Sequence, residues 1–253
     1  MKKTIEQLHL VAQYLAAAGI SFLNKELDDS HTNVGWNSDK KRMETHAFGS
    51  GNHQLAINLE RAHLEWLKDG FATDSIDLQQ NTHSSILIWI SALAAKNEIK
   101  QPYSYNFHYD LPYATIGDND KFTFKADALN EIIAQLNIGQ NAFETFLDEN
   151  DLASPIRIWP HHFDLGVYAS INSEGSIFMA AGLAIPDSLV DDLYYYASAY
   201  NDGTEVVSKN LTGLTIGDWR SDWNGATLPS SQIDAIKAIN FLNEARKEFL
   251  NHV

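Results

Sequence analysis

The sequence predicts an α+β fold in which a mainly antiparallel, curved sheet carries helices packed on one face. Three observations indicate this class. Short runs of alternating apolar and polar residues fill 20–78 and 155–200. Turn residues separate these runs, as in GSGN at 49–52 and KDG at 68–70. Longer segments with apolar residues at helical spacing flank them.

A helix is predicted over 4–18, because Ile5, Leu8, Val11 and Leu15 recur at helical spacing. Two lysines before this apolar run resemble the start of a secretory signal. However, four polar residues interrupt the run, namely Glu6, Gln7, His9 and Gln13. We therefore interpret the segment as an amphipathic helix whose apolar face packs on a sheet.

Antiparallel strands are predicted after this helix. Leu55, Ile57 and Leu59 share one face of one run, and Leu64 and Trp66 share a face of the next. A second helix follows over 83–96, capped near Thr82 or Ser84. Its apolar residues continue nearly all round the cylinder, so we expect it to be central and buried, with Trp89 and Ile90 almost inaccessible to solvent.

The run at 103–113 predicts a strand with one aromatic face, because aromatic and polar residues alternate along it. One broken helix or two helices are predicted over 126–149, where Gly139 interrupts the apolar stripe. Strands are then expected at 155–159, 163–171, 176–185 and 193–200. The last helix should begin near a capping box formed by Ser231 and Asp234.

The order of helix, strands and helix occurs twice. The chain 1–253 is interpreted as a single globular domain, and the alternative is two pseudo-repeated halves that meet near 100–125.

Composition excludes several classes of partner. The 253 residues carry 33 Asp and Glu against 18 Lys and Arg, a formal net charge of −15. This charge opposes polyanions, so we expect no nucleic-acid partner and no membrane partner.

Cysteine is absent, which excludes disulfides, thiol nucleophiles and cysteine metal sites. The apolar run at 86–95 is far below the ~20 residues that span a bilayer. A soluble, cytoplasmic protein is expected.

Three short motifs occur in a fixed order along the chain. They are Leu8, His9 and Gln13 in the first helix, then Trp159, Phe163, Asp164 and Leu165, then Tyr194, Tyr196, Ala197 and Tyr200. In this order the chain resembles an uncharacterised bacterial family, a domain of unknown function, over about residues 5–250. Two family features differ here: AAAG replaces a Gly-Lys after the first helix, and NDG replaces Pro-Glu-Pro after the aromatic strand. The resemblance implies a single co-folding unit and no particular activity.

Three histidines precede a carboxylate by two residues: His63 with Glu65, His108 with Asp110, and His162 with Asp164. In a strand, such residues share a face, which suits two metal ligands or a carboxylate that orients an imidazole. Ten histidines in so acidic a chain would produce one or two such pairs by chance.

The pair at 162 and 164 is favoured, because Pro160 interrupts strand pairing just before it. His161 would then share the core face with Trp159, and we expect it to be a satisfied core histidine. The candidate catalytic residues are His162, Asp164, His108 and Asp110, and no metal ligand or cofactor is assigned.

Aromatic side chains supply candidate ligand-binding residues, because small-molecule sites combine aromatic walls with a few polar groups. These are Trp159, Tyr105, Tyr109, Tyr168, Tyr194 and Tyr196.

No phosphate loop, G-x-S-x-G or H-E-x-x-H motif appears. The leading hypothesis is a protein that binds a small neutral or cationic ligand in an aromatic and histidine-lined pocket. The alternatives are a metal-assisted or acid/base hydrolase that uses His162 and Asp164, and a structural or partner-binding protein without a site. The oligomeric state is left open.

Overall fold

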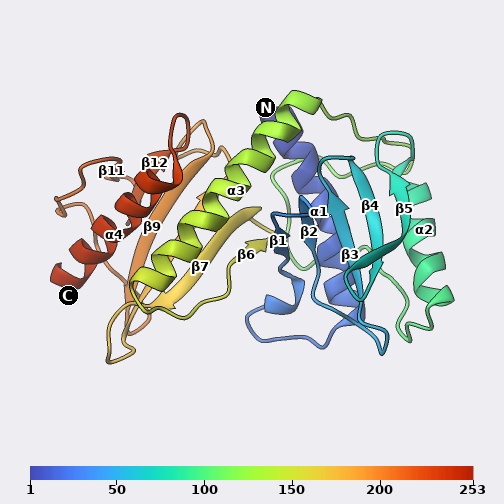
Figure 1. Ribbon diagram of the computed structural model, residues 1–253, viewed down its shortest axis with the longest axis horizontal. Coiled ribbons are helices and arrows are strands. Elements are labelled where there is room, and N and C mark those ends of the chain that lie inside the picture. The colour runs from blue at the N-terminus through green and yellow to red at the C-terminus, as the bar shows by residue number, and fades with distance from the viewer. Residues whose placement is uncertain (253) are drawn as a thin grey trace. The chain divides into compact units, whose positions relative to one another are not determined.

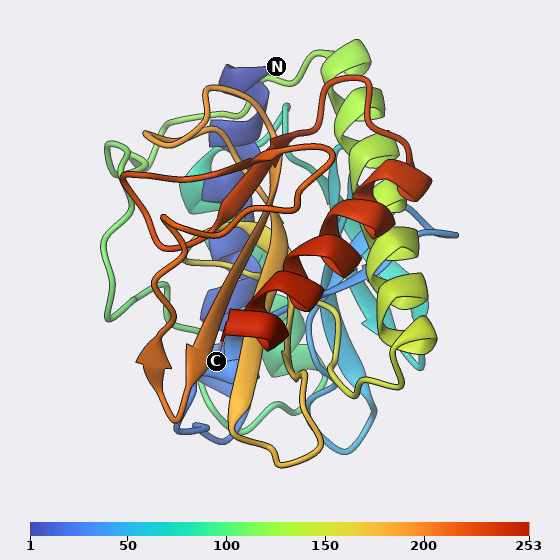
Figure 2. The same ribbon diagram turned by 90° about the vertical axis from the view of Figure 1, so that its left-hand side faces the viewer.

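The computed structural model describes residues 1–252 (Figures 1 and 2). Its helices are α1 (Lys2–Phe22), η1 (Ser30–Thr32, a 3-10 helix), α2 (His83–Lys96), α3 (Ala126–Glu149) and α4 (Ala235–His252). Its strands are β1 (Gly35–Asn37), β2 (Arg42–Glu44), β3 (His53–Asn58), β4 (His63–Lys68), β5 (Phe71–Asp77), β6 (Arg157–Trp159), β7 (Asp164–Ser170), β8 (Ile177–Ala184), β9 (Tyr194–Asn201), β10 (Thr204–Glu205), β11 (Asp218–Trp219) and β12 (Ala226–Pro229). These described strands form antiparallel sheets of five and seven strands, which confirms the predicted α+β fold.

The chain divides into two compact units, and each is considered by itself. The first contains Met1–Ala134 and Ile158–Phe163, and the second contains Gln135–Arg157 and the chain from Asp164 to the C-terminus. The units therefore part within α3, later in the sequence than the segment 100–125. Among residues 1–252, none of the helices combines the length and the apolar character needed to cross a bilayer.

The first unit is built on a meander with the strand order β1-β2-β3-β4-β5. One face of this sheet is apolar, because Met43, Ile57 and Leu64 are in register and Leu55 lies opposite Trp66. All five side chains are buried, and α1 contacts β3. The predicted alternation of β3 and β4 and the helix at the N-terminus are thus confirmed.

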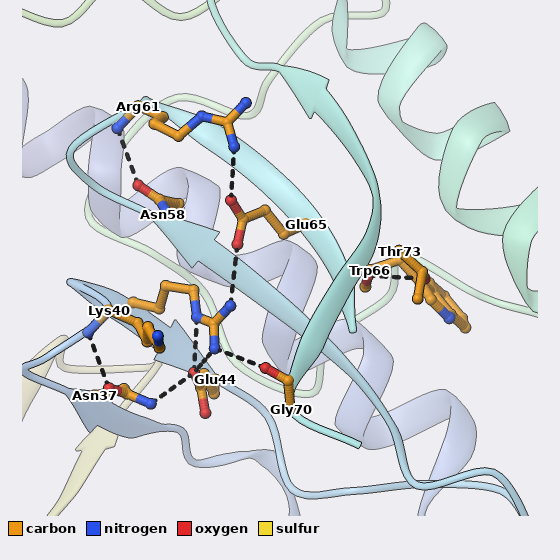
Figure 3. Close-up of polar contacts among 10 residues, drawn as sticks. Asn37, Lys40, Glu44, Asn58, Arg61, Glu65, Trp66, Gly70 and Thr73 are labelled. Carbon is orange, nitrogen blue, oxygen red and sulfur yellow. Dashed lines mark hydrogen bonds and ion pairs between the residues drawn. The ribbon is translucent and has the colours of Figure 1, made fainter. Parts of the chain in front are cut away.

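The other face of the same sheet holds a buried charge network (Figure 3). Arg42 donates from Nε to Glu44 Oε1 at 2.9 Å and from Nη2 to Gly70 O at 3.1 Å, and its Nη1 lies 3.4 Å from Glu65 Oε2. Arg61 Nη1 reaches Glu65 Oε1 at 3.5 Å. Two positive and two negative groups therefore neutralise one another where water is largely excluded, since Arg42 and Glu65 are both buried.

The predicted helix over 83–96 is confirmed as α2, with Thr82 as its N-cap, which accepts from the Ser85 N–H at 3.3 Å. Its expected burial on all sides is wrong. Only one stripe is buried, formed by Ile86, Ile90 and Leu93, while the side chain of Ile88 is 70% exposed. Trp89 is half-buried and donates its indole N–H to Asp74. Apolar composition therefore does not by itself place a helix in the core.

The strand predicted at 103–113 is absent from the described sheets, although the alternation along it is correct. Tyr103 and Tyr109 are half-buried, whereas His108 is exposed. The Tyr103 hydroxyl donates to Tyr14 O at 3.1 Å, so this extended segment lies alongside α1. The backbone groups of a helix already bond to one another, so they cannot form a ladder of hydrogen bonds with a neighbouring segment. This explains why the segment is extended but is not a strand.

The strands of the second unit have the order β11-β12-β9-β8-β7, with β10 on β9. The predicted strands at 155–159, 163–171, 176–185 and 193–200 correspond to β6, β7, β8 and β9, with ends shifted by at most two residues. Figure 1 shows the second-unit part of α3 and α4 on the same side of β7 and β9.

The break expected at Gly139 is wrong, because α3 is one continuous helix. A Cβ at Gly139 would lie 3.2 Å from Leu183 Cδ2 and 3.3 Å from Leu165 Cδ2. The glycine therefore allows the helix to pack closely on the sheet, and the rest of the helix outweighs its poor propensity. At the start of α4, Asp234 rather than Ser231 caps the helix by accepting from the Lys237 N–H at 2.9 Å.

We predict that Arg42→Leu lowers the free energy of unfolding by about 3–5 kcal/mol, because it removes the buried counter-charge of Glu65 and leaves only the exposed Arg61 as a partner. The double variant with Glu65→Leu should recover part of this loss. Lys41→Leu is the control, since Lys41 pairs with Glu60 at the surface and should contribute less than about 1 kcal/mol. Urea unfolding measures all three. Equal stability of the Arg42 and Lys41 variants would contradict the role of the network.

Candidate functional site

A strained turn, Pro160–Phe163, follows β6 and is called the histidine turn because it contains His161 and His162. The Trp159 carbonyl accepts from the His162 N–H at 3.2 Å and from the Phe163 N–H at 2.6 Å. Phe163 has φ 58, in the left-handed region that disfavours residues with a bulky side chain. Such a conformation costs about 1–3 kcal/mol and persists only where surrounding contacts hold it.

Two side chains of α1 supply those contacts. His9 Nε2 and Gln13 Nε2 each donate to the Pro160 carbonyl at 2.8 Å. The two residues are four apart, so they lie on one face of the helix. The His9 ring also stacks on Phe163, with centroids 5.1 Å apart and planes 9° from parallel. Both ends of the histidine turn are therefore attached to the first helix.

His9 is neutral at physiological pH and has a structural role. Its Nε2 must carry the hydrogen, because the Pro160 carbonyl can only accept, so Nδ1 accepts from the Tyr113 hydroxyl at 3.4 Å. Burial lowers the pKa of His9 to about 4, and the nearby His162 and His161 lower it further, against the effect of the hydrogen bond to Pro160.

His161 differs from His9 because its ring is half-buried and makes no hydrogen bond to any residue between 1 and 252. The rings of His162, Tyr109 and Trp159 surround it, with centroids 4.2, 5.8 and 6.0 Å away. Burial, followed by the charge of His162, lowers the pKa of His161 to about 4, although Asp29 acts in the opposite direction. A neutral imidazole offers one donor and one acceptor. The expectation that His161 is a satisfied core histidine is wrong.

The predicted pair of His108 and Asp110 is not the one that the structure forms. His108 Nε2 lies 3.0 Å from Asp29 Oδ2, and Asp110 is exposed. The rule that residues two apart share a face applies to strands, and this segment is not one. Asp29 is 79 residues away, and no pattern in the sequence could have identified it.

The remaining candidate residues divide between the units. His63 Nδ1 bonds to Arg61 O at 2.6 Å rather than to Glu65. His162 is exposed within the histidine turn, in the first unit, whereas Asp164 is buried at the start of β7, in the second. His162 and Asp164 therefore do not continue one regular strand, because Phe163 interrupts it.

Of the predicted ligand-binding aromatic residues, Trp159, Tyr105 and Tyr109 belong to the first unit. The Tyr105 ring packs against His83 and Tyr14, and the Tyr109 hydroxyl donates to Gln13 Oε1 at 2.7 Å. The Tyr109 contact joins this aromatic residue to the side chain that holds the histidine turn.

The other three aromatic candidates belong to the second unit. The Tyr194 hydroxyl donates to Asp187 at 2.8 Å, and the Tyr196 hydroxyl donates to Asp164 at 2.6 Å. Burial, together with these carboxylates, raises the pKa of both phenols. Tyr168 is 52% exposed. Among residues 1–252, no group of three or more His, Asp or Glu side chains is arranged to hold a metal ion.

Two residues of the site, His9 and Gln13, had a signal in the sequence. They are polar residues within an otherwise apolar helical face, and buried polar groups are expected to have partners. The sequence alone could not show that their shared partner is a carbonyl about 150 residues later.

We predict that the free energy of unfolding falls as the pH drops from about 6.5 toward 4. In this pH window His9 binds a proton in the unfolded chain but not in the folded one. The neutral His9 therefore contributes its full stabilisation only above about pH 6.5. For His9 the loss should be about 3 kcal/mol. The decrease should be smaller by that amount in His9→Gln, measured by denaturation at several pH values. An NMR titration that placed the His9 ring near 6.5 would disprove this.

No family model matches the chain, and no curated protein or solved structure is detectably similar to it.

Proposed function

We propose that the protein binds a small neutral or cationic ligand at the histidine turn. The observation that carries this proposal is His161, a half-buried neutral imidazole whose ring nitrogens have no partner in the described chain. An accessible imidazole that makes no hydrogen bond within the chain can bond to a ligand, and small-molecule sites combine such polar groups with aromatic walls.

The rigidity of the turn supports the same proposal. His9 and Gln13 fix the Pro160 carbonyl, and Phe163 is held in a costly conformation. Side chains that are held in place before binding lose less entropy when the ligand arrives, which raises affinity. Trp159 and Tyr109 supply apolar ring surface on either side of His161.

The charge of the site favours an uncharged or positive ligand. Both His9 and His161 are neutral at pH 7, and the Asp29 carboxylate interacts electrostatically with His161. The chain as a whole carries −15. A ligand amine could donate to the free nitrogen of His161, and its charge would be attracted by the acidic surroundings.

A thermal-shift screen of small amines and neutral heterocycles, followed by calorimetric titration of the hits, tests this proposal. His161→Phe keeps the size of the ring but removes both nitrogens, so the Kd should rise by about tenfold or more. His63→Gln is the matched control in the same unit and should bind as the parent does. The proposal fails if no compound binds, or if His161→Phe binds every hit with unchanged affinity.

A second candidate function is acid/base catalysis, for which His108 and Asp29 provide a specific observation. A carboxylate 3.0 Å from Nε2 orients the imidazole and leaves Nδ1 available as a base. The side chain of His108 is 53% exposed, so a substrate could reach it. His162, which is also exposed, would remain a candidate for the second proton-transfer group.

We expect Asp29→Asn to lower kcat by about 10²–10⁴-fold on any ester or glycoside that the protein hydrolyses, because the imidazole loses the carboxylate that orients it. Asp110→Asn should leave kcat unchanged. The pH dependence of kcat/KM for both variants is the measurement. Equal loss in the two variants, or no turnover of any chromogenic ester or glycoside by the parent, would rule out this candidate.

A further inference from the structure

The second sheet has one face that is rich in aromatic residues. Along β7, β8 and β9 the side chains alternate, and Leu165, Leu183 and Tyr195 point toward the helices, since Gly139 of α3 meets the two leucines and Phe143 contacts Tyr195. Twelve positions form the opposite side, called here the aromatic face: Asp164, Gly166, Tyr168, Ser170, Phe178, Ala180, Gly182, Ala184, Tyr194, Tyr196, Ser198 and Tyr200.

Three rings at one end of this face form a platform. Tyr168 and Phe178 are stacked, with centroids 5.1 Å apart and planes 14° from parallel. Tyr200 lies directly across from Phe178 in the register, and its centroid is 6.3 Å from that of Tyr168. The residue opposite Tyr168 is Ala180, which is too small to cover the ring. Tyr168 consequently remains 52% exposed.

Tyr196 continues the aromatic surface toward the other end of the strands. A Cβ at Gly182 would lie 2.6 Å from Tyr196 Cε1, so the ring lies over the place where another residue would have a side chain. The hydrogen bond to Asp164 fixes the ring in this position, and Trp223 contacts its edge at 6.2 Å. Several rings therefore follow one another along the strands, as an elongated ligand would require.

The aromatic face carries no Lys or Arg, and its one acidic side chain, Asp164, is buried and accepts from the Tyr196 hydroxyl. Beside the face, Glu205 of β10 is exposed and lies across from Tyr200. The accessible part of the face is the ring platform, where Tyr168 is exposed and Phe178 and Tyr200 are half-buried, and exposed aromatic surface of this kind is typical of a binding surface. Its chemistry combines ring faces, which attract C–H groups, with the phenol hydroxyls of Tyr168 and Tyr200. A ligand with apolar C–H faces, many hydroxyl groups and no charge is complementary to both features.

We propose that the aromatic face binds an uncharged carbohydrate chain, with a sugar ring stacked on the exposed ring of Tyr168 and on Tyr200 beside it. This site lies in the second unit and is independent of the ligand proposed for the histidine turn. Single-stranded nucleic acid also stacks on aromatic residues, but its phosphates require Lys or Arg, and the twelve positions contain neither.

Affinity electrophoresis of the full chain tests the proposal, with hydroxyethyl cellulose, glycogen, galactomannan and dextran as the probes and the oligonucleotide dT20 as the anionic comparison. We expect at least one neutral polysaccharide to slow migration and dT20 to have no effect. Binding to dT20 that exceeds binding to every polysaccharide would overturn the proposal. Failure of all four polysaccharides to slow migration would overturn it as well.

Variants then assign the site. Tyr168→Ala should weaken polysaccharide binding by about tenfold or more, whereas Tyr168→Phe, which keeps the ring, should retain most of it. Ala180→Glu, beside the ring, should block binding without removing any aromatic residue. Phe71→Ala is the control, because Phe71 is also exposed, at 77%, but lies on β5 of the first unit. Unchanged binding by both Tyr168→Ala and Ala180→Glu would overturn the assignment.

Discussion

The Pro160 carbonyl accepts two hydrogen bonds from α1, and the candidate site in the first unit depends on them. His9 and Gln13 converge on this one oxygen from residues about 150 positions earlier. They also orient the segment that runs along α1, since Tyr109 donates to Gln13 and Tyr113 to His9. The first helix is therefore both the centre of the apolar core and the support for the histidine turn.

The polar side chains of the first unit differ in whether they have hydrogen-bond partners. Arg42 and Glu65 are fully paired, and their charges balance within the sheet. Their donors and acceptors are engaged, so this network stabilises the sheet and leaves little capacity for a ligand. His161 is half-buried, and its ring nitrogens make no hydrogen bond within residues 1–252. This difference, rather than the abundance of histidines, distinguishes a candidate site from structural chemistry.

The predictions from residue spacing succeeded where the backbone is regular. The apolar face of β3 and β4 followed from alternation, and the apolar face of α1 from helical spacing. They failed for His108 and Asp110, because the segment that contains them lies alongside a helix and pairs with no strand. They failed again at Phe163, whose left-handed backbone ends the alternation between His162 and Asp164. Local periodicity cannot anticipate a conformation that distant side chains impose.

The sequence by itself determined the α+β class, most of the long strands and most helix limits, because these follow from the local spacing of apolar residues and from turn and capping residues. It also determined the strong negative charge. Only the tertiary structure decided which buried histidine is satisfied, which carboxylate meets His108, and that α3 passes through Gly139 without a break. The physical reason is that hydrogen-bond partners, burial and pKa depend on groups brought together from distant parts of the chain, and one sequence contains no record of those distances.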